Sequence, residues 1–159
     1  MGWPAQRRLL MRFLLLLAIS ACSTASAGQH IRVHDGDTFT LDGTRWRLWG
    51  VDAPELDQTC AGSPCGVQAR EELRSLIACH SVTCQPRGRS YDRTVGVCTA
   101  GGLDLGAEMV RSGCALDYRR YSGGAYAGQE SEARRKTIGI WTSTFTAPWL
   151  YRLTMARGR

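Results

Sequence analysis

Four acidic residues and one arginine lie close together in residues 34–57, and their side chains suit metal-assisted chemistry. They are Asp35, Asp37, Asp52, Glu55 and, between the second and third acids, Arg47. Carboxylate oxygens are the donors that hard cations such as Ca²⁺ and Mg²⁺ prefer. We therefore expect a divalent-cation site in this stretch.

The expected roles follow from charge and position. Asp37 and Asp52 are the natural cation ligands. Glu55 follows a proline, whose fixed φ would hold the carboxylate near the ligand pair but apart from it, where it could deprotonate a water. The planar guanidinium groups of Arg47 and Arg93 match phosphate oxygens. Cation, base and arginine together indicate phosphodiester hydrolysis.

Each feature also has an explanation without chemistry. An Asp-Gly-Asp-Thr segment taken alone is most often a solvated turn. Arg47 could lie on a solvent-facing strand, Glu55 could cap a helix, and Arg93 could form a loop salt bridge. The joint pattern is much less expected by accident than any one of its parts.

A predicted β-hairpin brings these residues together. Asp42-Gly43 is a two-residue loop that accepts positive φ in a type I′ turn, and β-branched and aromatic residues flank it. The turn pairs Phe39 with Trp46. It also places Asp37 opposite Leu48, so the two ends of the stretch return to one another.

Strict alternation along this hairpin conflicts with the expected site. It would place Asp37 on the apolar face with Phe39, and Arg47 on the opposite face. Either the regular strand stops before Asp37, or a bulge at Gly36 or near Gly50 re-aims a side chain. We expect such an irregularity.

The remaining elements follow from apolar periodicity and from turn residues. A strand is expected at 29–33, and a surface loop at 118–124. The later elements expected are helices at 67–78, 105–112 (with Asp104 as N-cap) and 127–138, and strands at 81–85 and 94–99, which a polar connection joins.

The first 27 residues are typical of an export signal. Three arginines precede an apolar run too short to span a bilayer, and Ala25-Ser26-Ala27 offers a cleavage site. Ile19-Ser20-Ala21-Cys22 equally resembles a bacterial lipobox, in which the signal ends at residue 21 and Cys22 carries lipid. We expect a periplasmic or secreted protein, or one anchored to a membrane by lipid at Cys22.

The formal net charge of +6 overstates the basic character of the mature chain. Three of the 20 basic residues and none of the 14 acidic residues lie in the expected signal, which leaves +3. This mild excess is compatible with a polyanionic partner and does not identify one.

Six cysteines remain after the signal, an even number that predicts three disulfides in an exported domain. Cys60 and Cys65 are close enough in sequence to bridge locally. Cys84 and Cys98 would face each other across two strands, and we predict that they bridge. A zinc site is the alternative, but no pair has Cys-x-x-Cys spacing and the histidines are scattered.

Four segments share a pattern with a known family. They are Asp35-Gly-Asp-Thr38, Arg47-Leu-Trp-Gly-Val-Asp-Ala-Pro-Glu55, Tyr91-Asp-Arg-Thr-Val-Gly96 and Gly139-Ile-Trp141. In this order they resemble the thermonuclease family, whose best-known member is staphylococcal nuclease. The resemblance implies an α+β fold, a five-stranded OB-like β-barrel with three helices. It divides the chain into a signal (1–27), a nuclease domain (28–147) and a basic tail (148–159).

The resemblance also implies roles for single residues. Asp37 and Asp52, through their carboxylates, and Ala53, through its carbonyl, would bind Ca²⁺. Glu55 falls on the position of the proposed general base. The remaining matches are the phosphate-binding arginines Arg47 and Arg93 and the nucleotide-contacting aromatic residues Tyr121 and Tyr118.

The implied reaction is cleavage of DNA and RNA at the 5′-oxygen with little sequence preference, which leaves 3′-phosphate ends. Nucleic acid is the expected partner, and no protein partner is implied. Two alternatives remain: a non-catalytic OB-like nucleic-acid-binding module, and a Ca²⁺-stabilised structural lipoprotein. The first would lack some of the acids or arginines, and the second would not need Arg47.

Overall fold

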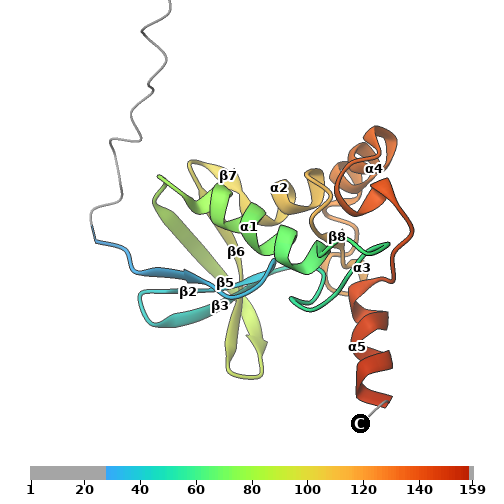
Figure 1. Ribbon diagram of the computed structural model, residues 1–159. Coiled ribbons are helices and arrows are strands. Elements are labelled where there is room, and N and C mark those ends of the chain that lie inside the picture. Colours follow the sequence, from blue (N-terminus) through green and yellow to red (C-terminus); the bar gives the residue numbers. More distant parts are fainter. Residues whose placement is uncertain (1–27, 158–159) are drawn as a thin grey trace, which may run out of the picture.

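The computed structural model describes residues 28–157 of the chain, which combine β-sheets with separate helices. The expected signal peptide, with its alternative processing site at Cys22, and the last two residues of the expected tail lie outside this range. Figure 1 shows the main sheet on the left, α1 and α2 above it, and α5 on the right. Within residues 28–157, no helix is both long enough and apolar enough to cross a bilayer.

Six strands form the main sheet, in the order β1-β2-β3-β6-β5 with β7 paired to β6. Its neighbours are antiparallel except β3 and β6, which run parallel. These strands are β1 (Ile31–Val33), β2 (Thr38–Leu41), β3 (Thr44–Leu48), β5 (Val82–Ser90), β6 (Arg93–Ala100) and β7 (Leu103–Asp104). A second sheet pairs β4 (Val51–Asp52) with β8 (Leu116–Asp117).

The helices follow the sheet in the second half of the chain, apart from α1. They are α1 (Cys65–Ile77), α2 (Leu105–Arg111), α3 (Arg119–Ser122), α4 (Ala127–Lys136), the 3₁₀-helix η2 (Gly139–Thr142) and α5 (Pro148–Arg157). The expected N-cap at Asp104 is confirmed, because its carboxylate accepts hydrogen bonds from the backbone N–H groups of Gly106 (2.8 Å) and Ala107 (3.2 Å).

The α+β class is confirmed, but the expected closed barrel and its element counts are wrong. The main sheet stays open, because its outer strands β1 and β5 do not pair with each other. Gly50 has a φ of 72° and ends the path of β3, so that β4 leaves the main sheet and pairs with β8. Two of the described helices, α3 and α5, form where we expected a surface loop and an unassigned basic tail.

The first hairpin has the predicted register, in which Phe39 pairs with Trp46. Asp42 and Gly43 have φ values of 47° and 81°, as a type I′ turn requires. The backbone N–H of Leu48 donates to the carbonyl of Asp37 (2.8 Å), although β2 begins only at Thr38. The regular strand therefore stops before Asp37, which is the first of the two predicted irregularities.

The second hairpin, β5–β6, is longer than the sequence indicated. The polar connection expected after residue 85 instead continues the strand, with a register shift between Pro86 and Gly88. Proline and glycine are tolerated there because a bulge needs no regular ladder bond. The hairpin turns at Tyr91, whose φ is 56°, and its tip projects away from the helices (Figure 1).

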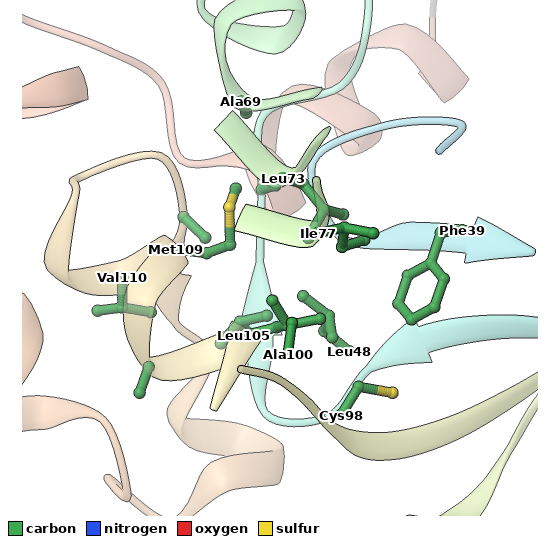
Figure 2. Close-up of a cluster of buried hydrophobic side chains, with 14 of the residues drawn as sticks. Phe39, Leu48, Ala69, Leu73, Ile77, Cys98, Ala100, Leu105, Met109 and Val110 are labelled. Atoms are coloured by element: carbon green, nitrogen blue, oxygen red, sulfur yellow. The ribbon is translucent and has the colours of Figure 1, made fainter. Parts of the chain in front are cut away.

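The core lies between the main sheet and the helices α1 and α2. Figure 2 shows Phe39, Leu48 and Cys98 of the sheet close to side chains of both helices. The α1 residues Ala69 and Leu73 are fully buried, as their helical spacing predicted. A smaller cluster joins Cys60, Cys65, Leu116 and Ile140, with Trp141 and Trp149 packed against it. Ile140 and Trp141 of the fourth motif segment thus pack in this second core.

Two of the three expected disulfides are confirmed. Cys60 bridges to Cys65, and Cys84 bridges to Cys98, its cross-strand partner. The expectation that all six cysteines pair among themselves is wrong, because Cys114 has a free thiol. Cys114 packs against the main core in the turn after α2, and burial raises the pKa of its thiol.

Candidate active site

Arg47 joins the two aspartates that the sequence predicted as cation ligands. Its Nη1 donates to Oδ1 of Asp37 (2.8 Å), and its Nη2 donates to Oδ1 of Asp52 (2.7 Å). Asp37 lies just before β2, Arg47 on β3 and Asp52 on β4. The carboxylates are 3% and 0% exposed. One guanidinium therefore spans both acids and holds the two carboxylates at the same place in the fold.

Close backbone packing fixes the turn that carries the first acids. A Cβ on Gly36 would lie 2.6 Å from the Cβ of Ala69 and 2.7 Å from that of Ala53. The turn therefore lies directly against helix α1 and the segment after β4. This contact positions Asp37 beside Ala53, whose backbone N–H donates to Oδ2 of Asp37 (3.3 Å).

Glu55 lies in a loop that is fixed on two sides. Gln58 is 1% exposed; its Oε1 accepts from the N–H of Glu55 (3.2 Å), and its side-chain amide donates to the carbonyl of Thr146 (2.7 Å). On the other side, a Cβ on Gly66 would lie 1.7 Å from the carbonyl oxygen of Glu55. The first turn of α1 thus supports this loop, while the Glu55 carboxylate remains partly exposed.

Arg93 reaches the same cluster from the start of β6. Its Nη1 donates to Oγ1 of Thr38 (3.3 Å), and this hydroxyl donates to Oδ1 of Asp37 (2.8 Å). The sequence predicted Arg93 for this site, and the fold brings it there. Arg47 and Arg93 therefore approach Asp37 from different strands.

A cleft of about 560 Å³ opens over these groups. Tyr118 and Tyr121, the predicted nucleotide-contacting residues, form part of its wall, with their rings 5.0 Å apart and edge to face. The other predicted site residues that line the cleft are Asp37, Arg47, Ala53, Glu55 and Arg93. Asp52 lies just beneath the surface. The structure thus brings together all eight residues that the sequence predicted for the site.

Comparisons with known proteins identify the family of the chain. Residues 45–143 match the family described as "Staphylococcal nuclease homologue". The chain belongs to the staphylococcal nuclease family.

Several relatives within this family have names of their own. The chain is 30% identical over 145 residues to a Haemophilus influenzae protein named "Uncharacterized endonuclease", covering 85% of the chain and 79% of that protein. It is 36% identical over 117 residues to a succinoglycan biosynthesis protein of Rhizobium meliloti, covering 69% of the chain and 61% of that protein. It is 34% identical over 112 residues to a staphylococcal-like nuclease of Arabidopsis thaliana, covering 68% of the chain and 33% of that protein. The chain thus spans less than two thirds of two of these relatives.

Sequence reasoning missed Arg152, which belongs to this staphylococcal nuclease-like site. Arg152, on α5, donates from Nη1 to Oε1 of Glu55 (2.7 Å) and to Oδ1 of Asp52 (3.0 Å), and from Nη2 to Oδ2 of Asp52 (2.9 Å). Its position in a basic tail, beyond the family match at residue 143, gave no signal for this contact. Arg87 and Arg89 of the longer hairpin also line the cleft and were missed.

The charges of the site balance one another. Burial raises the pKa of Asp52, while Arg152 and Arg47 oppose this rise. Burial also works against the charged form of Arg47, but Asp37 and Asp52 outweigh it and raise its pKa. Burial, and then the charge of Asp37, raise the pKa of Asp35 to about 6. The arginines therefore stay protonated, and they oppose the loss of charge that burial favours at Asp52.

The donor set fits a hard divalent cation. Asp37 and Asp52 offer carboxylate oxygens, and the backbone of Ala53 lies beside them. Among residues 28–157, no three His, Cys, Asp or Glu side chains form a metal-binding group. A cation would thus take two carboxylates, with backbone and water oxygens completing its shell. Zinc fits poorly, because Cys60, Cys65, Cys84 and Cys98 are all in disulfides.

Proposed function

We propose that this protein is an exported, Ca²⁺-dependent nuclease that hydrolyses phosphodiester bonds of DNA and RNA and leaves 3′-phosphate ends. The observation that carries the proposal is the bridge that Arg47 makes between Asp37 and Asp52 beneath an arginine-lined cleft. Family membership supports it, since relatives carry the names endonuclease and staphylococcal-like nuclease. A non-catalytic module would not need Glu55 and two arginines around one carboxylate pair.

The chain's own residues have distinct roles in this reaction. Asp37, Asp52 and the carbonyl of Ala53 would hold Ca²⁺, which when bound neutralises charge on the phosphate and orients a water. Glu55 accepts the proton of that water as its oxygen bonds to phosphorus. The bond from phosphorus to the 5′-oxygen breaks, and this oxygen gains a proton from solvent.

Two arginines stabilise the charge that develops in this step. The phosphate gains negative charge on its equatorial oxygens as the fifth oxygen approaches. Arg47 and Arg93 line the cleft from β3 and β6, and their planar guanidinium groups match phosphate oxygens. Because Arg93 is held through Thr38 rather than by a carboxylate directly, it is free to turn toward a phosphate.

The cleft walls account for the low sequence preference in the proposal. Tyr118 and Tyr121 offer aromatic faces, on which any base can stack. Arg87 and Arg89 line the cleft from the long hairpin, where they can contact phosphates. Phosphate and stacking contacts hold a strand without reading base edges. DNA and RNA are therefore both proposed substrates.

The proposal is tested by incubating plasmid DNA and RNA with the purified protein, with Ca²⁺ and with chelator. We expect degradation with Ca²⁺ and none with chelator. The products should carry 3′-phosphates, which a phosphatase can remove. Glu55→Gln should lose roughly 10²–10⁴-fold in kcat, the usual contribution of a general base. Glu71→Gln, at an exposed position on α1, is the control. Degradation in chelator, or full activity of Glu55→Gln, would reject the assigned roles.

Export is tested separately, on the protein recovered from cells of its source. Mass spectrometry of the mature N-terminus distinguishes cleavage after Ala27 from cleavage before a lipidated Cys22. An intact N-terminus on the recovered protein would contradict the export proposal.

A further inference from the structure

Helix α5 places its own positive charge on the proposed catalytic carboxylates. The guanidinium of Arg152 engages both oxygens of Asp52 and one oxygen of Glu55, with distances of 2.7–3.0 Å. Asp52 is a proposed cation ligand, and Glu55 is the proposed base. A single side chain, almost 100 residues away in sequence, thus neutralises two groups that the reaction needs free.

A second contact of the same helix covers a substrate-binding side chain. Trp149 lies parallel to Tyr118, with the ring centroids 5.3 Å apart. Tyr118 is one of the two tyrosines on which a base would stack. The other tyrosine, Tyr121, packs edge-on against it. Helix α5 therefore blocks the carboxylates and an aromatic face at the same time, although these features lie on different elements.

The helix is attached to the domain mainly at its beginning. Pro148 is the only buried residue of α5, and the segment before it is held by the hydrogen bond from Gln58 to the carbonyl of Thr146. Every residue after Arg152 is exposed up to Arg157, and the Arg152 side chain is itself 38% exposed. Besides Trp149 and Arg152, Tyr151 contacts the domain, through a hydrogen bond with Asp57, and these contacts would be lost if the helix swung away.

Arg152 and a divalent cation cannot share Asp52 at low cost. Ca²⁺ binds carboxylate oxygens at roughly 2.3–2.6 Å. With Arg152 in place, the cation would lie within a few ångströms of a second guanidinium besides that of Arg47, and like charges at that distance repel. Without either Arg152 or a cation, Asp52 and Glu55 would lose a positive charge that offsets their own. The cation and the arginine are therefore alternative counter-charges for the same carboxylates.

We propose that α5 is an autoinhibitory helix, in which Arg152 occupies the carboxylates of the resting protein until Ca²⁺ displaces it and frees the site. This inference rests on the proposed function. The closed helix lowers the apparent Ca²⁺ affinity by the fraction of molecules that are open, so the variant without the arginine binds more tightly. It also makes activity rise with Ca²⁺ in two linked steps, helix release and cation binding.

Calorimetry of Ca²⁺ binding without nucleic acid tests the proposal. Arg152→Met keeps an unbranched side chain without the charge, and Arg152→Ala is a second variant in case one folds poorly. We expect both to bind Ca²⁺ roughly tenfold tighter than the unmodified protein, if the helix is closed in about nine molecules of ten. Arg157→Met, an exposed arginine on the same helix, should bind as the unmodified protein does.

Hydrogen exchange provides a readout that does not depend on affinity. Ca²⁺ should speed exchange of the α5 amides in the unmodified protein and leave those of α1 unchanged. In Arg152→Met, the α5 amides should exchange fast with and without Ca²⁺. Greater protection of α5 with Ca²⁺ would overturn the proposal, because it would mean that the helix closes over the cation.

The outcomes separate this inference from the proposed function. If Ca²⁺ supports hydrolysis but both Arg152 variants bind it no more tightly, the autoinhibitory role is wrong and the nuclease function stands. A lower kcat of Arg152→Met at saturating Ca²⁺ would likewise overturn the inference, because it would make Arg152 a phosphate-binding group. If no form binds Ca²⁺ or cleaves nucleic acid, both proposals fail.

Discussion

The first hairpin and helix α5 bring arginines to the same buried aspartate in opposite ways. Arg47 lies five residues before Asp52, on the preceding strand of the chain, and its side chain is 16% exposed. Arg152 reaches Asp52 from a helix that is mostly exposed. The first contact is built into the sheet, and the second can open without disturbing it. Similar hydrogen bonds can therefore belong to a fixed site or to a removable cover.

The largest expected effect comes from removing Arg47, the arginine whose contact is fixed. Arg47→Ala should lower kcat by roughly 10³–10⁵-fold, because arginines that stabilise a transferring phosphoryl group contribute about this much. Steady-state cleavage of plasmid DNA at saturating Ca²⁺ measures the loss. Arg45→Ala removes an arginine from the same strand that pairs only with the exposed Asp92, and serves as control. Circular dichroism establishes that both variants fold. A loss of less than tenfold would contradict the role of Arg47.

A substitution beneath the hairpin tests whether its position depends on packing. Gly36→Ala should lower the free energy of unfolding by about 1–3 kcal/mol, since its new methyl group would overlap Ala53 and Ala69. Urea denaturation measures the change. Gly128→Ala, on α4, meets no atom within 4 Å and should be neutral or stabilising. Equal stability of the two variants would mean that the turn moves freely.

The pH dependence of the free energy of unfolding tests the environment of Asp35, which lies in the turn before the first hairpin. In chelator, the pKa of Asp35 is raised to about 6, so the folded protein holds a proton that the unfolded chain has released. Stability should therefore fall as pH rises from about 4 to about 6, by on the order of 1–2 kcal/mol. Asp35→Asn should remove this part of the slope. Urea denaturation across the pH range tests this, and an unchanged slope in the variant would contradict it.

The smallest expected effect concerns Trp149, on helix α5. Trp149→Ala should lower KM for single-stranded DNA by roughly fivefold, because it exposes a stacking face worth about 1 kcal/mol per base. Initial rates at fixed Ca²⁺ give KM and kcat separately. Leu150→Ala changes an exposed neighbour on the same helix and should leave KM unaltered. A higher KM in Trp149→Ala would place the tryptophan in the binding site instead.

The sequence predicted the first hairpin and its site residues well, because local rules determine this part of the fold. Asp42-Gly43 sets the turn, the turn sets the register, and the register brings Asp37 back to the end of β3. The regular strand begins only at Thr38, so Asp37 lies outside it, and this resolves the conflict that strict alternation had raised. Local turn chemistry and two-residue periodicity were sufficient for this part of the site.

The second half depended on contacts that local rules do not encode. Pro86 and Gly88 are strand breakers in sequence, yet a register shift accommodates both inside β5. Helix α5 buries only Pro148, so no apolar stripe marks it in the sequence. The contact of Arg152 arises from tertiary placement alone. The even number of cysteines predicted that Cys114 would form a disulfide, but in the fold its thiol is free.

The narrow space at Gly66 limits how this scaffold can be diversified. Any side chain there would collide with the backbone of Glu55, so a library built on this chain should hold position 66 constant. The hairpin tip is the opposite case: Tyr91 is 92% exposed, and a Cβ on Gly88 would meet nothing within 4 Å. Variation aimed at new substrates belongs at that tip, where randomised positions leave Glu55, the proposed general base, undisturbed.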